Sequence, residues 1–149
     1  MPGETAPPAV PPPEVLALYL RPAAGEAFPG EALASAFSAV GLQFGPMNIY
    51  HHYGAGKLRV NRPLFSVANM FEPGSLALEG APGFSTEGLA LFIQLPGPLN
   101  GPEAFELFLS VAQRLAEGLK AELLGEPRKA LDSVAIERMR RIAARHVAQ

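Results

Sequence analysis

The sequence contains no cysteine and no tryptophan, and its only aspartate is Asp132. Without cysteine there are no disulfides and no thiolate metal ligands, and the composition permits a cytosolic protein. No apolar run approaches the roughly 20 residues that a membrane-spanning helix needs. The N-terminus also lacks the basic and then apolar segments of a secretion signal.

Charge is moderate and unevenly distributed. The 149 residues include 12 Lys or Arg and 14 Asp or Glu, and the net charge of −2 gives no general attraction to nucleic acid. Residues 128–149, however, carry six basic residues against Asp132 and Glu137. A hydrophobic content of 48% is sufficient for one domain with a substantial core.

The first thirteen residues differ in composition from the rest, since six of them are proline. Such a segment has little to bury and favours a disordered or polyproline conformation. We therefore predict that residues 1–13 are a disordered, proline-rich linker remnant and that the folded domain covers residues 14–149.

The remaining chain alternates between strand and helix patterns. Strict alternation predicts strands, whereas apolar residues three or four apart predict helices. The expected strands are 14–20, 42–53 (interrupted at Gly45-Pro46), 62–70, 89–95 and a short one within 121–127, with a glycine-rich hairpin loop at 54–61 and a mostly irregular stretch at 71–88. The expected helices are 30–41, 100–120 and 132–148. This order predicts an α+β fold: an antiparallel sheet of about six strands with three helices packed on one face, of split β-α-β type.

The last expected helix has a clear start signal. Asp132 is a suitable N-cap, because its carboxylate can accept a hydrogen bond from the first turn. The residues expected to face the core from this helix are Ile136, Met139, Ile142, Ala143 and Val147.

Alternation along the strands separates two sets of side chains. One set is bulky and aliphatic and suits the core under the helices. The other set is also apolar, although the solvated face of an antiparallel sheet should be polar. With no further amphipathic helix to cover it, this second face is predicted to be an open, shallow apolar cleft that binds a partner. The alternative, strands buried on both faces, stays open. The predicted partner-binding residues are Val15, Ala17, Met47, Ile49, Ala68, Met70, Ala90 and Phe92.

Two motifs are better explained without chemistry. His51 and His52 are neighbours on a strand and point to opposite faces, so they cannot easily share a metal or a proton. The residues GAGK at 54–57 lack the full phosphate-loop spacing, and a hairpin turn explains them. We predict no catalytic residue, no metal, no cofactor and no small-molecule substrate.

Two alternatives stay open: RNA binding, suggested by the basic C-terminal helix, and a homodimer, suggested by the apolar face. Open, helix-backed sheets also bind RNA, but they stack bases on aromatic residues of an RNP1 pattern that this sequence lacks. We therefore expect no nucleic-acid partner. A homodimer through the apolar face is the other alternative, and we predict a monomer in isolation.

Four segments carry a family resemblance: FGPMNIYHHY (44–53), PLFSVANMFEPG (63–74), GLALFIQLPGP (88–98) and FELFLSVAQRLAEGL (105–119). In this order they resemble the C-terminal FtsZ-binding domain of the bacterial cell-division protein ZipA, from about Val15 to Val147. The resemblance implies a six-stranded sheet backed by three helices and an apolar cleft that takes the C-terminal tail of FtsZ.

The resemblance assigns the cleft to the same residues that alternation selects. It also implies a non-enzymatic role in septation and a location on the cytoplasmic side of the inner membrane at the division site. The family pattern includes a transmembrane anchor, and we expect this chain to lack it. Two positions depart from the family pattern: Glu72 stands where a lysine can occur, and Ala17 where an isoleucine can occur. Both bear on partner affinity rather than on the fold.

Overall fold

The computed structural model describes residues 11–71, 74–78 and 83–147. Most of the predicted linker, residues 1–10, and the departing residue Glu72 lie outside these ranges, so both predictions stay predictions. The strands are β1 Glu14–Arg21, β2 Phe28–Pro29, β3 Gln43–Phe44, β4 Tyr50–His52, β5 Phe65–Asn69, β6 Ser85–Thr86, β7 Leu89–Leu95 and β8 Glu122–Leu124. The helices are α1 Gly30–Ala39, α2 Gly101–Leu119 and α3 Ser133–Ala144, with short 3-10 turns at Pro46–Asn48 and Gly56–Leu58.

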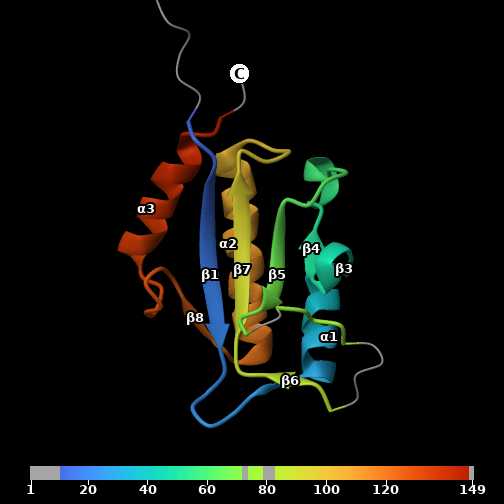
Figure 1. Cartoon of the computed structure of the whole chain (residues 1–149). Coiled ribbons are helices and arrows are strands. Elements are labelled where there is room, and N and C mark those ends of the chain that lie inside the picture. The colour runs from blue at the N-terminus through green and yellow to red at the C-terminus, as the bar shows by residue number, and fades with distance from the viewer. Residues whose placement is uncertain (1–10, 72–73, 79–82, 148–149) are drawn as a thin grey trace, which may run out of the picture.

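The fold is the predicted α+β class. Six strands form one antiparallel sheet in the order β3-β4-β5-β7-β1-β8. The long strands β1 and β7 lie near its middle and pair over seven residues, from Glu14 with Leu95 to Leu20 with Leu89. Figure 1 shows α2 running behind the sheet, with α1 and α3 near its two sides.

The main core lies between the sheet and the helices. Leu16, Leu18 and Leu20 of β1 are buried, as are Leu91 and Ile93 of β7, because alternation directs all of them to the helix side. The helices contribute buried residues at helical spacing, including Phe37 of α1, Phe105, Phe108 and Leu115 of α2, and Met139 and Ala143 of α3. All three helices therefore share one core with one face of the sheet.

The predicted cap of the last helix is confirmed, but its predicted end is wrong. The Ala135 N–H donates to Oδ1 of Asp132 at 2.8 Å. Met139 and Ala143 are buried and Ile136 and Ile142 partly so, but Val147 is 48% exposed. The helix ends at Ala144, and Val147 therefore leaves the helical register that would have turned it toward the core.

The structure also corrects the region that was predicted as an interrupted strand. Met47 and Asn48 both have positive φ, 65° and 59°, and lie in a turn between the short strands β3 and β4. A left-handed backbone is uncommon for a residue such as methionine. Because Met47 lies in a turn, strand alternation does not determine where its side chain points. The stretch predicted as irregular, 71–88, contributes β6, which pairs with β2 in a small second sheet.

His52 lies on the helix side of β4 and stacks on Phe65, with ring centroids 4.7 Å apart. The Gly54 N–H donates to its Nδ1 at 3.1 Å, so Nε2 carries the hydrogen and donates to the Val40 carbonyl at 3.0 Å. Burial lowers the pKa of His52 below its ordinary value, and this outweighs the opposing effect of the Val40 carbonyl. The imidazole is therefore a neutral structural group.

This environment predicts a dependence of stability on pH. The folded-state pKa of His52 is below the unfolded value of about 6.5, so the unfolded chain binds the proton more readily. Its contribution to stability is complete above about pH 6.5 and is lost as the pH falls below that value, with a slope of at most about 1.4 kcal/mol per pH unit. The free energy of unfolding of wild type and of His52→Gln is measured by urea unfolding at several pH values between about 5 and 7.5. We expect it to change less steeply with pH in the variant than in wild type. Equal slopes would contradict this assignment.

Candidate functional site

The sheet face opposite the helices, called the open face below, is built from rows of side chains. The strand register pairs Ala17 of β1 with Phe92 of β7, Phe92 with Ser66 of β5, and Ser66 with His51 of β4. The next row joins Tyr19, Ala90 and Ala68. Small residues thus occupy the middle of the face, and Phe92 stands among them.

The predicted partner-binding residues of the three central strands lie on this face, but the eight differ in exposure. Val15 is 60% exposed and Met47 85%, whereas Ile49 is buried. The other five are half-buried: Ala17, Ala68, Met70, Ala90 and Phe92. Ile49 is absent from the main core cluster and lines the surface hollow described next. It therefore forms part of the floor, and its assignment as a partner contact stays a prediction, as do the other seven.

A hollow of about 330 Å³ opens on the β4–β5–β7 part of this face. Met47, Ile49 and Phe92 line it together, so the structure brings three of the eight residues into one depression. The other five lie outside its lining. The eight residues therefore do not line one pocket, and alternation along the strands did not indicate this difference between them.

Met70 keeps its place because Gly88 has no side chain. The Met70 N–H donates to the Gly88 carbonyl at 3.0 Å. A Cβ on Gly88 would lie 2.9 Å from the Met70 sulfur, so the thioether rests directly on the glycine. This packing orders a side chain that is otherwise flexible.

His51 and Ser66 also lie on the open face, although neither is among the eight predicted partner-binding residues. Nδ1 of His51 lies 2.7 Å from Oγ of Ser66, and Nε2 lies 2.8 Å from the Pro46 carbonyl oxygen. Both ring nitrogens are therefore engaged, and both residues are buried. Residue spacing could have indicated His51, because it lies two residues after Ile49 and alternation places both on the same face. The prediction that the two histidines point to opposite faces is confirmed, because His52 stacks on the core side.

The β8 end of the open face is closed by charged residues. The guanidinium of Arg128 lies 4.7 Å from the centroid of the Tyr19 ring, and the Tyr19 hydroxyl donates to Glu126. Burial, together with Glu126, raises the pKa of Tyr19. Leu124 is buried here outside the main core. This end is therefore covered by the segment between β8 and α3.

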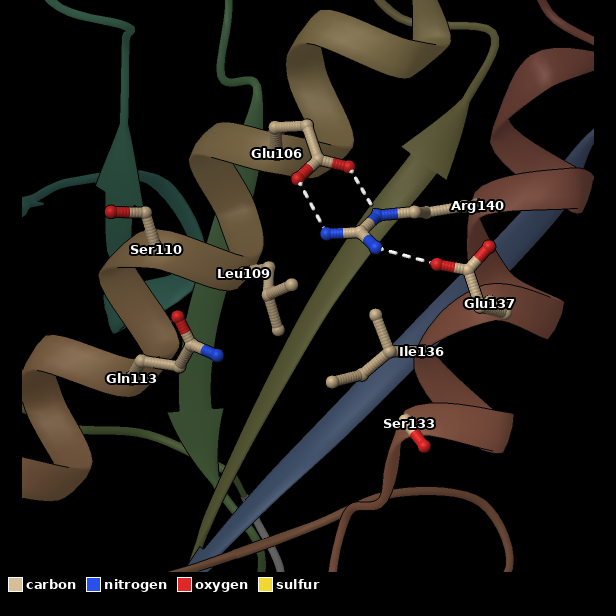
Figure 2. A pocket seen from close by; sticks show the side chains of 8 residues that line it. All are labelled: Glu106, Leu109, Ser110, Gln113, Ser133, Ile136, Glu137 and Arg140. Atoms are coloured by element: carbon tan, nitrogen blue, oxygen red, sulfur yellow. Dashed lines mark hydrogen bonds and ion pairs between the residues drawn. The ribbon is translucent and has the colours of Figure 1, made fainter.

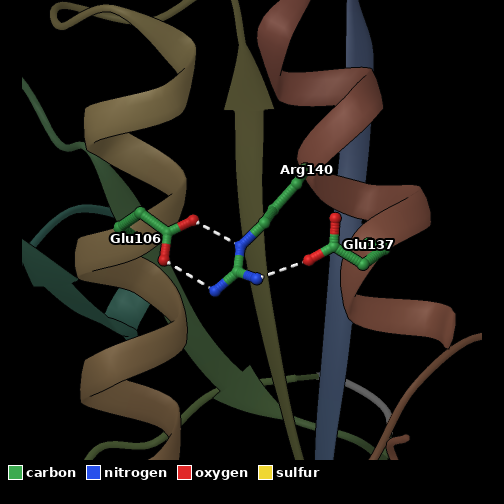
Figure 3. A network of polar contacts seen from close by, with 3 residues as sticks. All are labelled: Glu106, Glu137 and Arg140. Atoms are coloured by element: carbon green, nitrogen blue, oxygen red, sulfur yellow. Dashed lines mark hydrogen bonds and ion pairs between the residues drawn. The ribbon is translucent and has the colours of Figure 1, made fainter. Parts of the chain in front are cut away.

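A second depression, of about 260 Å³, lies between α2 and α3. Figure 2 shows Leu109 and Ile136 within it, with Arg140 reaching between Glu106 and Glu137. Figure 3 shows the same three charged residues joining the two helices. Arg140 donates Nε to Glu106 at 2.8 Å, Nη2 to the other Glu106 oxygen at 3.1 Å, and Nη1 to Glu137 at 2.6 Å.

These carboxylates, Glu106 first, raise the pKa of Arg140 further above its usual value. Because Arg140 is bonded to both carboxylates, the three residues form an inter-helix clamp and leave the groove a poor candidate for a ligand site. Among the described residues no group of three or more His, Cys, Asp or Glu could hold a metal ion. In the same part of the chain, no helix is both long and apolar enough to cross a membrane.

The fold and its open face define a class of protein, an α+β interaction domain with an apolar sheet surface. Comparison with known families matches residues 14–142 to "ZipA, C-terminal FtsZ-binding domain", and the chain belongs to this family. The family is a non-enzymatic domain of bacterial cell division, which agrees with the prediction from sequence.

The chain is similar to curated relatives named cell division protein ZipA. It is 40% identical over 128 residues to that of Marinobacter nauticus, 85% of this chain and 37% of the relative. It is 36% identical over 129 residues to that of Azotobacter vinelandii, 85% of this chain and 44% of the relative. For Ectopseudomonas mendocina the figures are 36% over 134 residues, 89% of this chain and 48% of the relative. The chain therefore spans less than half the length of these three relatives.

Proposed function

We propose that this chain binds the C-terminal tail of FtsZ on its open face and, within a longer assembly, links the division ring to the cytoplasmic side of the inner membrane. The observation that carries the proposal is the apolar face itself. Ala17, Ala68 and Ala90 leave room beside Met70 and Phe92, and no helix among the described residues covers them. Membership of a family described as FtsZ-binding supports the choice of partner.

The chemistry of such a face is burial of a short apolar segment. Covering about 500 Å² of apolar surface yields roughly 12 kcal/mol. Loss of rigid-body freedom and ordering of a flexible tail cost about 4–15 kcal/mol. With a cost at the low end of that range about 8 kcal/mol remains, which corresponds to an affinity near micromolar. Large side chains near the centre carry most of it, and the alanines contribute by letting the partner's side chains approach.

The decisive experiment compares FtsZ with and without its C-terminal tail in titrations against the full 149-residue chain. We expect binding near micromolar for the intact protein and loss of at least about tenfold in affinity without the tail. A synthetic tail peptide should recover most of the affinity. Equal binding of both FtsZ forms would contradict the proposed partner segment.

The two other readings of the open face predict different outcomes. A homodimer through this face would sediment at twice the monomer mass and lose the dimer on addition of tail peptide. RNA binding would give salt-dependent retention on a gel. The structure weakens the basis for RNA, because Arg140 is held by Glu106 and Glu137, Arg145 pairs with Glu14 at 3.1 Å, and Arg128 lies on Tyr19.

A further inference from the structure

The lining of the hollow is mostly apolar but includes two kinds of polar residue. His51 and Ser66 are buried and already bonded, whereas Arg62 and Gln94 are exposed. Of the described residues that line the hollow, Arg62 is the only Lys, Arg, Asp or Glu. The candidate site is thus an apolar depression with a single permanent charge at its β4–β5 side.

Neither polar group is engaged within the described chain. No hydrogen bond or ion pair joins the side chain of Arg62 or Gln94 to another described residue. His51, in contrast, has both ring nitrogens occupied by Ser66 and Pro46, so it offers no free donor. Arg62 and Gln94 therefore hold the unused hydrogen-bond donors of this hollow, and an arginine fork fits a carboxylate best.

At the opposite end of the face the charged residues already contact other side chains. Arg128 there lies against the Tyr19 ring, and Glu126 accepts from the Tyr19 hydroxyl. The two ends of the face are consequently different: free positive charge at the β4–β5 end, and cationic and anionic groups already engaged at the β8 end. A bound segment with one acidic end would therefore bind preferentially with that end at the β4–β5 side.

The geometry points to Arg62, assisted by Gln94, as a specificity residue that binds a carboxylate of the tail segment and fixes the direction in which that segment crosses the sheet. This inference rests on the proposed function. The carboxylate is either an Asp or Glu side chain or the terminal carboxylate of the tail. Its partner chemistry is the same in both cases, and the two sources are separated by peptide variants.

The test measures binding of a labelled synthetic FtsZ tail peptide to wild type, Arg62→Met and Arg59→Met. Arg59 is the matched control, since it is an exposed arginine of the same loop that is not part of the lining. At about 50 mM salt we expect Arg62→Met to weaken binding about fivefold and Arg59→Met to leave it within about twofold. At about 500 mM salt the difference should largely disappear.

Peptide variants then identify the carboxylate. The peptide is amidated at its C-terminus in one arm, and each Asp or Glu is replaced by Asn or Gln in the others. One variant should bind wild type and Arg62→Met equally, which is the coupling expected of a direct pair. If every variant retains the Arg62 effect, or if Arg59→Met equals Arg62→Met, the inference is wrong and the charge acts only at long range.

Phe92→Ala in the same titration separates two hypotheses: that the open face binds the tail, and that Arg62 binds a carboxylate of the tail. Loss of affinity in Phe92→Ala with an unaffected Arg62→Met overturns the carboxylate site alone. Unchanged affinity in both variants overturns the open face as the binding surface, and the carboxylate site with it.

Discussion

Phe92→Ala is expected to weaken binding of the FtsZ tail by about 10- to 50-fold while the domain stays folded. Phe92 stands beside Ala17 and Ser66 in the same row of the open face and lines the hollow, so a bound segment would bury what is left exposed. Truncating a large central side chain in an interface typically costs more than 1 kcal/mol. Met70→Ala should act in the same direction, since the thioether lies over Gly88 at the other side of the alanines.

The measurement is a titration of each variant with tail peptide, with circular dichroism to verify the fold. Phe44→Ala is a matched control, because Phe44 is a partly exposed aromatic (47%) on edge strand β3, where it contacts Tyr50 on the helix side. Its affinity for the peptide should stay within about twofold of wild type. If Phe44→Ala weakens binding as much as Phe92→Ala, the effect is not specific to the open face.

Gly101→Ala is expected to lower the free energy of unfolding by about 3 kcal/mol. Gly101 begins α2 at the point where the end of α3 crosses it. A Cβ there would lie 2.2 Å from the Ala143 carbonyl oxygen and 3.2 Å from the His146 Cβ. The obstacle is helix backbone, so the two helices must separate. That movement also strains the Gly101 N–H bond to the His146 carbonyl, 2.9 Å long.

The same helix supplies the control for this prediction. Gly118 is exposed near the end of α2, and nothing lies within 4 Å of a Cβ added there. Gly118→Ala should therefore raise the free energy of unfolding by about 0.5–1 kcal/mol, through helix propensity alone. Both variants are compared with wild type by urea unfolding. Gly101→Ala with wild-type stability would show that the helix contact relaxes without cost.

The corner around Gly101 also explains how the last residues of the domain are held. Nε2 of His146 lies 2.6 Å from Oε2 of Glu14, and Arg145 binds the other oxygen of the same carboxylate at 3.1 Å. The start of β1, the start of α2 and the end of α3 therefore meet at one place. Disruption by Gly101→Ala would loosen all three elements, which is why its expected effect exceeds that of a single lost contact.

Sequence patterns predicted the faces of helices and strands correctly where the pattern extends over several helical turns or several strand residues. Seven alternating residues in β1 and seven in β7 assigned a helix side and an open side, and the register confirms that division. The apolar stripe of α2 and the Asp132 cap were equally local signals. Such patterns are readable because each side chain's direction follows from its own backbone geometry.

The prediction failed where elements are short or where contacts join distant segments. β2 and β6 have two residues each and exist because they pair with one another across the chain. Met47 adopts a left-handed turn that strand propensity does not favour, and Val147 lies beyond the end of α3. No local pattern encodes these features, because their stability comes from tertiary partners rather than from neighbours in sequence.

The sequence by itself determined the fold class, the two faces of the sheet and the apolar character of the open one. Only the tertiary structure decided that Ile49 forms a floor, that His51 is bonded to Ser66 and that Arg128 lies on Tyr19 at the β8 end. It also decided that Arg62 and Gln94 line the hollow with side chains that have no partner among the described residues. The physical reason is that alternation fixes the direction of a side chain but not its neighbours. The depth of the hollow and the partners of its charged side chains depend on loops from distant parts of the sequence. The position of these loops is set by the packing of the whole domain.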